Sequence, residues 1–377
     1  MSLESLAKIS RFYGKNPDYV LAGGGNSSWK DGQTLYVKGS GMYMADAVPG
    51  SFVKMDREAL SQVWEKKYPD SSAERESAVL SDIMAARKPG EDKRPSVETL
   101  LHDIMPFSYV MHLHPALVNG VTCSRRGEEA LREIFGGEVL WIPICNPGYV
   151  LSKKVKTAME KFSKGKGAAP EIIFLQNHGV FVGANDTDGV KKLYDGIMSN
   201  IGALIKRKPD FSDEKIITNS SLQNPALGEA GCEIMRLLEK FAGAAAFTQS
   251  LEISSLVKDR ASFAPVSSAF TPDHIVYAGS DPLFTEEQTT KGIRRDFESH
   301  AKKTGGNPKI IAVQGLGVFG VGAPEKTALL ALELFKDSVK VAVYAESFGG
   351  HKFMTKEQID FINGWEAERF RVSTLSR

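Results

Sequence analysis

Cysteine is scarce in this chain of 377 residues, which has only Cys123, Cys145 and Cys232 and no Cys-x-x-Cys pair. An odd number of widely spaced thiols excludes a disulfide-stapled scaffold and favours a reducing compartment. The segment from Met1 to Lys15 carries scattered charges instead of the apolar core of a signal peptide, and no hydrophobic run approaches the length of a membrane span. The sequence therefore predicts a cytoplasmic protein.

An excess of charge of one sign is also lacking. The 47 Lys and Arg residues nearly balance the 46 Asp and Glu residues, so the formal net charge is +1. This balance provides no electrostatic attraction to nucleic acid or to an anionic membrane, and we expect neither as a partner. The length exceeds the size at which a single core usually stops growing, and 42% of the residues are hydrophobic. We therefore expect two domains, and this length and composition agree with an enzyme.

Nucleotide-binding motifs are absent or incomplete. The segment Ala22–Ser28 is rich in Gly, Asn and Ser but lacks the Gly-Lys-Ser/Thr ending of a P-loop. The segment Gly315–Gly320 matches G-x-G-x-x-G, but extended, Gly-rich chain follows it where a dinucleotide-binding turn would open into a helix. About 50 residues remain after it, too few for the rest of such a fold. The sequence therefore predicts no nicotinamide cofactor.

Three histidines stand where a metal site could form. His112 and His114 lie two residues apart in a strand-like run, so their side chains point to one face and can hold one ion. His178 follows the apolar run Ile172–Leu175 at a Gly turn, which would aim its imidazole out of the sheet. The alternative is that these are ordinary half-buried strand histidines. We interpret them as candidate metal ligands.

Polar residues in three other segments could serve the same site. Arg94–His102 has the pattern of a helix start, with Glu98 and His102 four residues apart on the side opposite the apolar residues. Glu98 could face the histidines or could only complement the helix dipole. The Gly-rich segments 22–28 and 39–41 could present backbone N–H groups to a phosphate, or could be simple turns.

Taken in order, the motifs GGGNSS, KGSG, PSVETLLH, HLHP and QNHG resemble the class II aldolase/adducin family. The resemblance is closest to the aldolase portion of bifunctional rhamnulose-1-phosphate aldolase/alcohol dehydrogenase proteins. It implies a three-layer α/β/α fold with a mainly antiparallel sheet, and a homo-oligomer. We expect residues 1–208 to form this domain, with a helix at 188–206 and a boundary in the polar stretch that follows.

The resemblance also implies a site and a reaction. The site would hold Zn²⁺ or another divalent metal, use a Glu for proton transfer and bind the substrate phosphate with Gly, Asn and Ser. The matching residues are His112, His114 and His178 for the metal, Glu98 for acid/base catalysis, and Gly25, Asn26, Ser40, Gly41 and Ser96 for the phosphate. Val97 stands where sugar-phosphate aldolases of the family tend to have a second Ser, so one phosphate-binding hydroxyl is missing.

The expected reaction is aldol cleavage of a phosphorylated ketose, such as rhamnulose 1-phosphate, to dihydroxyacetone phosphate and an aldehyde. A sugar-phosphate dehydratase or epimerase could use the same metal site, although retention of Glu98 disfavours the epimerase. A non-catalytic, adducin-like binding module is the alternative from another class. Loss of the metal histidines would be its mark, and this chain has all three.

The second half contains an echo of the first. Residues 170–181 and 308–319 share Pro-x-Ile-Ile-x-x-Gln-x-x-Gly-Val-Phe, with Leu316 in the place of His178. A weaker echo pairs 36–40 with 276–280. Chance recurrence of strand and loop sequences is the alternative. We expect residues 226–377 to form a smaller, degenerate and metal-free α/β domain, with strands at 274–278 and 309–314 and helices at 228–245 and 325–346.

Overall fold

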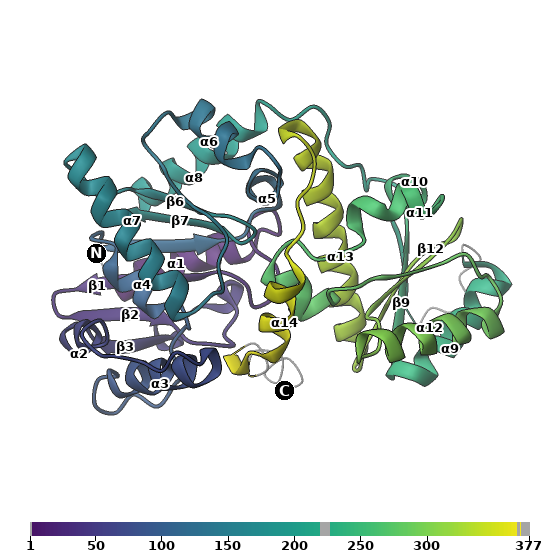
Figure 1. The fold of residues 1–377 in the computed structure, drawn as a ribbon, viewed down its shortest axis with the longest axis horizontal. Coiled ribbons are helices and arrows are strands. Elements are labelled where there is room, and N and C mark those ends of the chain that lie inside the picture. Colours follow the sequence, from purple (N-terminus) through teal and green to yellow (C-terminus); the bar gives the residue numbers. More distant parts are fainter. Residues whose placement is uncertain (1, 219–226, 368–369, 371–377) are drawn as a thin grey trace. The chain divides into compact units, whose positions relative to one another are not determined.

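The computed structural model describes residues 2–218, 227–367 and 370, which form two compact units (Figure 1). Of the described residues, the first unit contains 2–122, 126–204, 364–367 and 370, and the second contains 123–125, 205–218 and 227–363. Within the described residues, no helix is long and apolar enough to cross a membrane. The assignment of separate roles to 1–208 and 226–377 stays a prediction.

A seven-stranded sheet in the order β3-β2-β1-β4-β7-β6-β5 forms the centre of the first unit. Only β5 and β6 pair in parallel, and all the other neighbours are antiparallel. The mainly antiparallel sheet implied by the resemblance is therefore confirmed. The strands are β1 (Asn26–Asp31), β2 (Thr34–Lys38), β3 (Phe52–Asp56), β4 (Tyr109–Leu113), β5 (Leu140–Ile142), β6 (Ile172–Leu175) and β7 (Gly179–Ala184).

Helices cover both faces of this sheet. Side chains of α2, α3, α4 and α7 pack on one face with Val37, Val110 and Phe181, and α1, α5 and α8 pack on the other. Because side chains alternate along a strand, His112 shares its face with Val110, two residues before it. The helices are α1 (Leu3–Gly14), α2 (Arg57–Gln62), α3 (Ser72–Ala85), α4 (Thr99–Ile104), α5 (Ala116–Thr122), α6 (Gly127–Phe135), α7 (Tyr149–Lys166) and α8 (Thr187–Gly202).

The second unit has a five-stranded mixed sheet in the order β10-β11-β12-β9-β8. Its strands are β8 (Lys215–Thr218), β9 (Ala245–Gln249), β10 (Leu283–Thr285), β11 (Ile310–Val313) and β12 (Gly317–Val321). Helices α9 and α12 pack on one face, and α13 packs against β9 and β12. The helices are α9 (Gly228–Ala242), α10 (Leu251–Leu256), α11 (Arg260–Phe263), the π-helix η6 (His274–Ala278), α12 (Thr290–Thr304), α13 (Glu325–Ala345) and α14 (Lys356–Gly364).

The second sheet repeats five strands of the first. The order β1-β4-β7-β6-β5 corresponds to β8-β9-β12-β11-β10, with the same parallel and antiparallel pairings. Registers agree as well, because Leu175 pairs with Gly179, and Val313 pairs with Gly317, 138 residues further along. The local arrangement predicted from the main echo is therefore confirmed.

The repeated hairpin shows the same backbone details in both units. Asn177 and Gly315 both have positive φ, 56° and 70°. In each turn the next residue donates its backbone N–H to the last residue of the preceding strand, His178 to Leu175 and Leu316 to Val313. Gly317 continues directly into β12, antiparallel to β11. The G-x-G-x-x-G match thus lies in a β-hairpin, and the extended chain predicted to follow it in place of a helix is confirmed.

Three local predictions were wrong. Residues 274–278, expected as a strand, form the π-helix η6, so the weaker echo pairs unlike structures. All five are buried, and a short apolar run buried on every side has no periodicity that separates strand from helix. Residues 215–218, expected in the boundary segment, form β8 of the second sheet. The helix expected from residue 94 begins at Thr99, because Glu98 is its N-cap.

Candidate metal and acid/base site

The three predicted histidines meet at one point. His112 lies at the end of β4, His114 just beyond it, and His178 in the turn between β6 and β7. Their ligand nitrogens all lie within 4.8 Å of one another. The Nε2 atoms of His112 and His178 are 3.4 Å apart, and those of His112 and His114 are 2.8 Å apart. The register that pairs β4 with β7 brings His112 close to His178, which is 66 positions further along the chain.

The chemistry of this cluster fits a divalent metal. Nδ1 of His112 is 3.1 Å from the carbonyl oxygen of Val180, and since a carbonyl only accepts, this nitrogen must donate. Nε2 therefore keeps its lone pair for an ion, which is the arrangement found in metal-binding histidines. Tetrahedral zinc with Zn–N bonds of about 2.0–2.1 Å places its ligand nitrogens about 3.3–3.4 Å apart, close to the separation of His112 and His178.

Glu98 faces the same point. Its side chain is buried, and Oε1 lies 3.5 Å from Nε2 of His112 and 3.6 Å from Nε2 of His178. Among the described residues, Oε1 has no hydrogen-bond donor. A buried carboxylate oxygen without a donor is costly unless a cation or a proton approaches it. The geometry thus presents Oε1 to an ion or a substrate held by the histidines.

A chain of buried hydrogen bonds holds the other oxygen of this carboxylate. Nδ2 of Asn26 donates to Oε2 of Glu98 over 2.6 Å. Oδ1 of Asn26 accepts from Nε2 of His102, whose Nδ1 lies 2.8 Å from the hydroxyl of Ser28. Burial, followed by the charges of Lys30, His112 and Lys38, holds the pKa of His102 well below its usual range. His102 is therefore neutral, and this Glu98 hydrogen-bond chain has one consistent set of donors.

The predicted phosphate loops lie beside this chain. Gly25 has φ 64°, and a Cβ there would come within 2.9 Å of the backbone oxygen of His112. Ser40 donates its N–H to Arg94, and Ser96 donates its N–H to Lys38, so the loop that contains Ser40 and Gly41 adjoins the one that contains Ser96. The Ser96 hydroxyl oxygen also accepts from the Glu98 N–H. The side chain of Asn26 is occupied by Glu98 and His102.

Sequence reasoning missed two buried residues here. It assigned no role to Lys38, and none to His102 beyond its helix position. Lys38 is 3% exposed, and its ammonium group donates to the carbonyl oxygen of Met42 over 2.6 Å. The signal was available, because Lys38 stands immediately before Gly39-Ser40 at the end of a strand whose apolar residues alternate.

The second unit has lost this chemistry at the matching positions. Phe247 pairs with Phe319 as His112 pairs with Phe181, and the rings of Phe247 and Phe319 lie 4.9 Å apart. Leu316 stands in the turn at the place of His178, and Ile217 pairs with Phe247 as Asn26 pairs with His112. Aromatic and aliphatic side chains thus fill the space that the first unit uses for its polar site.

Known proteins resemble this chain over its whole length or over its first half. The "Uncharacterized oxidoreductase YuxG" of Bacillus subtilis (strain 168) is 20% identical over 414 residues, which cover 98% of this chain and 58% of that protein. The chain thus spans less than two thirds of that relative. The N-terminal class II aldolase domain of a conserved protein from Thermoplasma acidophilum is 25% identical with a TM-score of 0.46, covering 54% of this chain and 93% of that one. L-Fuculose-1-phosphate aldolase from Thermus thermophilus is 13% identical with a TM-score of 0.34, covering 53% and 92%.

The family model described as "Class II Aldolase and Adducin N-terminal domain" matches residues 4–195. This range is half of the chain and contains all three histidines, Glu98 and the Gly-rich loops. The chain belongs to the class II aldolase and adducin family.

Proposed function

We propose that this protein is a metal-dependent aldolase that cleaves a phosphorylated ketose to dihydroxyacetone phosphate and an aldehyde. The observation that carries the proposal is the position of Glu98. One carboxylate oxygen is held by Asn26, and the other faces the His112, His114 and His178 nitrogens without a donor among the described residues. A buried carboxylate oxygen that lacks a donor and faces imidazole nitrogens is placed to meet a cation or a proton.

The proposed roles follow from these contacts. His112, His114 and His178 would hold Zn²⁺ or another divalent ion, which when bound would supply the positive charge that stabilises developing negative charge on the substrate oxygens. Glu98 Oε1 accepts the proton of the substrate hydroxyl as the C–C bond breaks and returns a proton to the enediolate carbon. A positioned acid/base of this kind contributes about 10²–10⁴-fold.

The rest of the site orients the reactants. The Glu98 hydrogen-bond chain prevents the carboxylate from rotating, so that Oε1 keeps its direction without any cost at the moment of reaction. We assign the substrate phosphate to the loops of Gly25, Ser40, Gly41 and Ser96. Asn26 contributes its backbone there, because its side chain already bonds to Glu98 and His102.

Zinc-loaded protein tested against a panel of ketose 1-phosphates, with rhamnulose 1-phosphate included, provides the direct test. We expect release of dihydroxyacetone phosphate from at least one member, and no release by the His112→Ala variant. A dehydrated or epimerised product would reassign the reaction on the same site. Absence of turnover in protein that also fails to retain any divalent metal would instead support a binding module.

A further inference from the structure

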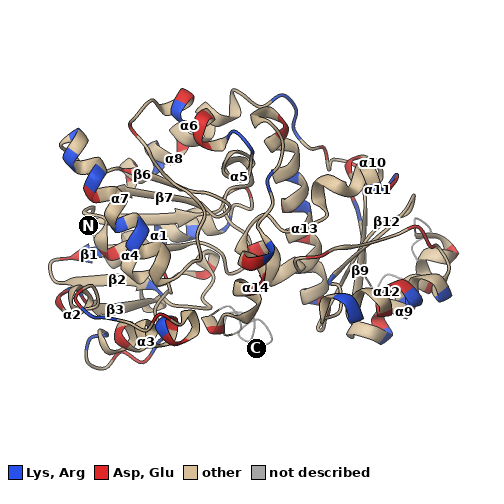
Figure 2. Cartoon of the chain, viewed as in Figure 1, with Lys and Arg blue, Asp and Glu red and all other residues tan. Residues whose placement is uncertain are grey.

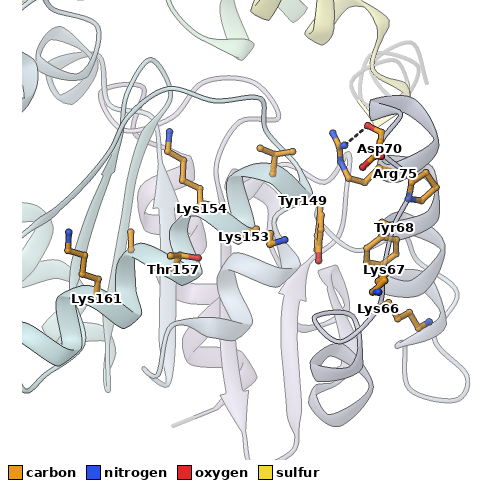
Figure 3. Close-up of a pocket in the computed structure, with 13 residues that line it drawn as sticks. Lys66, Lys67, Tyr68, Asp70, Arg75, Tyr149, Lys153, Lys154, Thr157 and Lys161 are labelled. Carbon is orange, nitrogen blue, oxygen red and sulfur yellow. Dashed lines mark hydrogen bonds between the residues drawn. The ribbon is translucent and has the colours of Figure 1, made fainter.

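A hollow of about 810 Å³ lies on the first unit, and its lining residues are drawn in Figure 3. One wall is the outer side of α7, and the other is the segment from Lys66 to Asp70 together with Arg75. The hollow shares no lining residue with the metal site. Its polar lining consists of Lys66, Lys67, Tyr68, Asp70, Arg75, Tyr149, Lys153, Lys154, Thr157 and Lys161.

Positive charge is concentrated in this hollow. Five lysines and one arginine line it, against the single carboxylate of Asp70. Lys153, Thr157 and Lys161 follow each other at four-residue spacing, so they form one stripe on α7, and basic residues recur along this helix (Figure 2). The whole chain carries a net charge of only +1. The cluster is therefore a local feature and not the result of a basic protein.

Within the described residues, three of the five lysines in the hollow lack partners, whereas Lys66 pairs with Asp82 and Lys154 donates to the carbonyl oxygen of Pro143. On α7, Lys156 bonds to Glu160 and Lys166 bonds to Glu138. Lys67, Lys153 and Lys161 have no hydrogen bond or ion pair with any residue in the described part of the chain. Like charges on one helix face destabilise it by a few tenths of a kcal/mol per pair. An anion in the hollow would relieve this repulsion.

The second unit shows that the fold does not require these lysines. Helix α12 occupies the place of α7 before the repeated hairpin, and both end at a left-handed Gly, Gly167 and Gly305. Val155 and Met159 correspond to Ile293 and Phe297, which are also buried. Of the pocket lysines on α7, Lys154 and Lys161 have Gly292 and Ser299 as counterparts, and only Lys153 has a basic one, Lys291.

We propose that this hollow binds a small molecule carrying two or more phosphoryl groups. Its volume falls within the range of about 300–1,000 Å³ typical of small-molecule sites. Ammonium groups on opposite walls suit separate phosphoryl groups, and Tyr68, Tyr149 and Pro69 offer apolar surface for the body of the ligand. Such a ligand is an effector, since the site does not reach the reacting groups.

Isothermal titration of the metal-loaded full chain with inorganic pyrophosphate, and with orthophosphate for comparison, tests this proposal. We expect pyrophosphate to bind more tightly than orthophosphate, and binding to weaken with added salt. The Lys153→Glu/Lys161→Glu variant should lose at least about tenfold in affinity, as expected for lost bonds to charged groups. The matched control is Lys302→Glu/Lys303→Glu, which changes two lysines in the last turn of α12.

Three results would overturn the proposal. Equal pyrophosphate affinity in the wild type and in Lys153→Glu/Lys161→Glu, both folded by circular dichroism, would show that the hollow is not the site. Loss of binding in His112→Ala, with the pocket intact, would assign the probe to the metal site. Binding to phosphatidylserine vesicles without binding to pyrophosphate would assign the lysines to a membrane surface. Retained pyrophosphate binding in Glu98→Gln, whose turnover is expected to fall, would support an effector site independent of the proposed reaction.

Discussion

Replacement of Glu98 by Gln tests the proposed chemistry most directly, because it changes the charge and proton affinity of the site and little else. The amide has nearly the shape of the carboxylate, and its oxygen can still accept from Asn26, as Oε2 does over 2.6 Å. The group that faces the histidine nitrogens at 3.5 and 3.6 Å becomes one that cannot accept a proton. We expect the fold and the metal content to be retained.

The expected loss is in turnover. Removal of a positioned general acid/base lowers kcat by about 10²–10⁴-fold, which corresponds to about 2.7–5.5 kcal/mol in the barrier. The change in KM should be smaller, because the residues assigned to the phosphate are untouched. The assay measures release of dihydroxyacetone phosphate by zinc-loaded variant and wild type, with zinc per chain determined on the same samples.

Glu76→Gln is the matched control. Glu76 is also a buried Glu of the first unit, with Oε2 bonded to the Tyr149 N–H and with Oε1 lacking a hydrogen bond in the described residues, although Oε1 lies 3.5 Å from Nε of Arg75. Burial raises the pKa of Glu76, yet it does not face the histidines, so its replacement should leave kcat unchanged. An unaltered kcat in Glu98→Gln, at full metal occupancy, would refute the acid/base role and leave Glu98 as a helix cap.

Four further outcomes follow from the structure. His112→Ala should abolish retention of about one zinc ion per chain, measured by elemental analysis. His300→Ala, outside the cluster, should retain the ion, and equal metal content in the two variants would contradict the proposed metal site. Gly179→Ala would place a Cβ 2.5 Å from a backbone oxygen of β4, and should weaken zinc binding by about 10–100-fold in a competition titration. Asn26→Ala leaves two buried groups of the Glu98 hydrogen-bond chain unpaired, which costs about 1–3 kcal/mol each. It should therefore lower both the free energy of unfolding and kcat, and unchanged values of both would refute the role of this hydrogen-bond chain. Desolvation lowers the pKa of Lys30 from 10.5 to about 7. Between these pH values the unfolded state binds one more proton than the folded state, so the free energy of unfolding rises with pH. Urea titrations should show this rise in the wild type and its loss in Lys30→Met.

Much of the fold was predictable because it depends on local patterns. The strand at 172–175, the helix at 325–345 and the hairpin at 310–321 have clear apolar periods or glycine turns. The run at 274–278 was not predictable, since five buried residues look alike as a strand or a helix. Strand β8 was hidden because its four residues lie in a polar stretch and gain their stability from pairing with β9.

The sequence by itself determined which chemistry is available. The spacing of His112 and His114 on a strand, and the Asn-His-Gly turn at His178, predicted three candidate nitrogen ligands, and the structure brings these three side chains together. The echo around Gly317 likewise predicted a repeated strand and Gly-rich loop, because the conformation of such a loop depends on nearby residues and on glycine.

Only the tertiary structure decided how these groups are connected. The Glu98 hydrogen-bond chain joins two residues of β1, Asn26 and Ser28, to Glu98 and His102 at α4. It adjoins the histidines because the strand register places Asn26 opposite His112. The same register places Ile217 opposite Phe247 in the second unit, where the site is filled by apolar side chains. A hydrogen bond between residues 72 positions apart has no local signature, since its geometry is set by packing across the whole sheet.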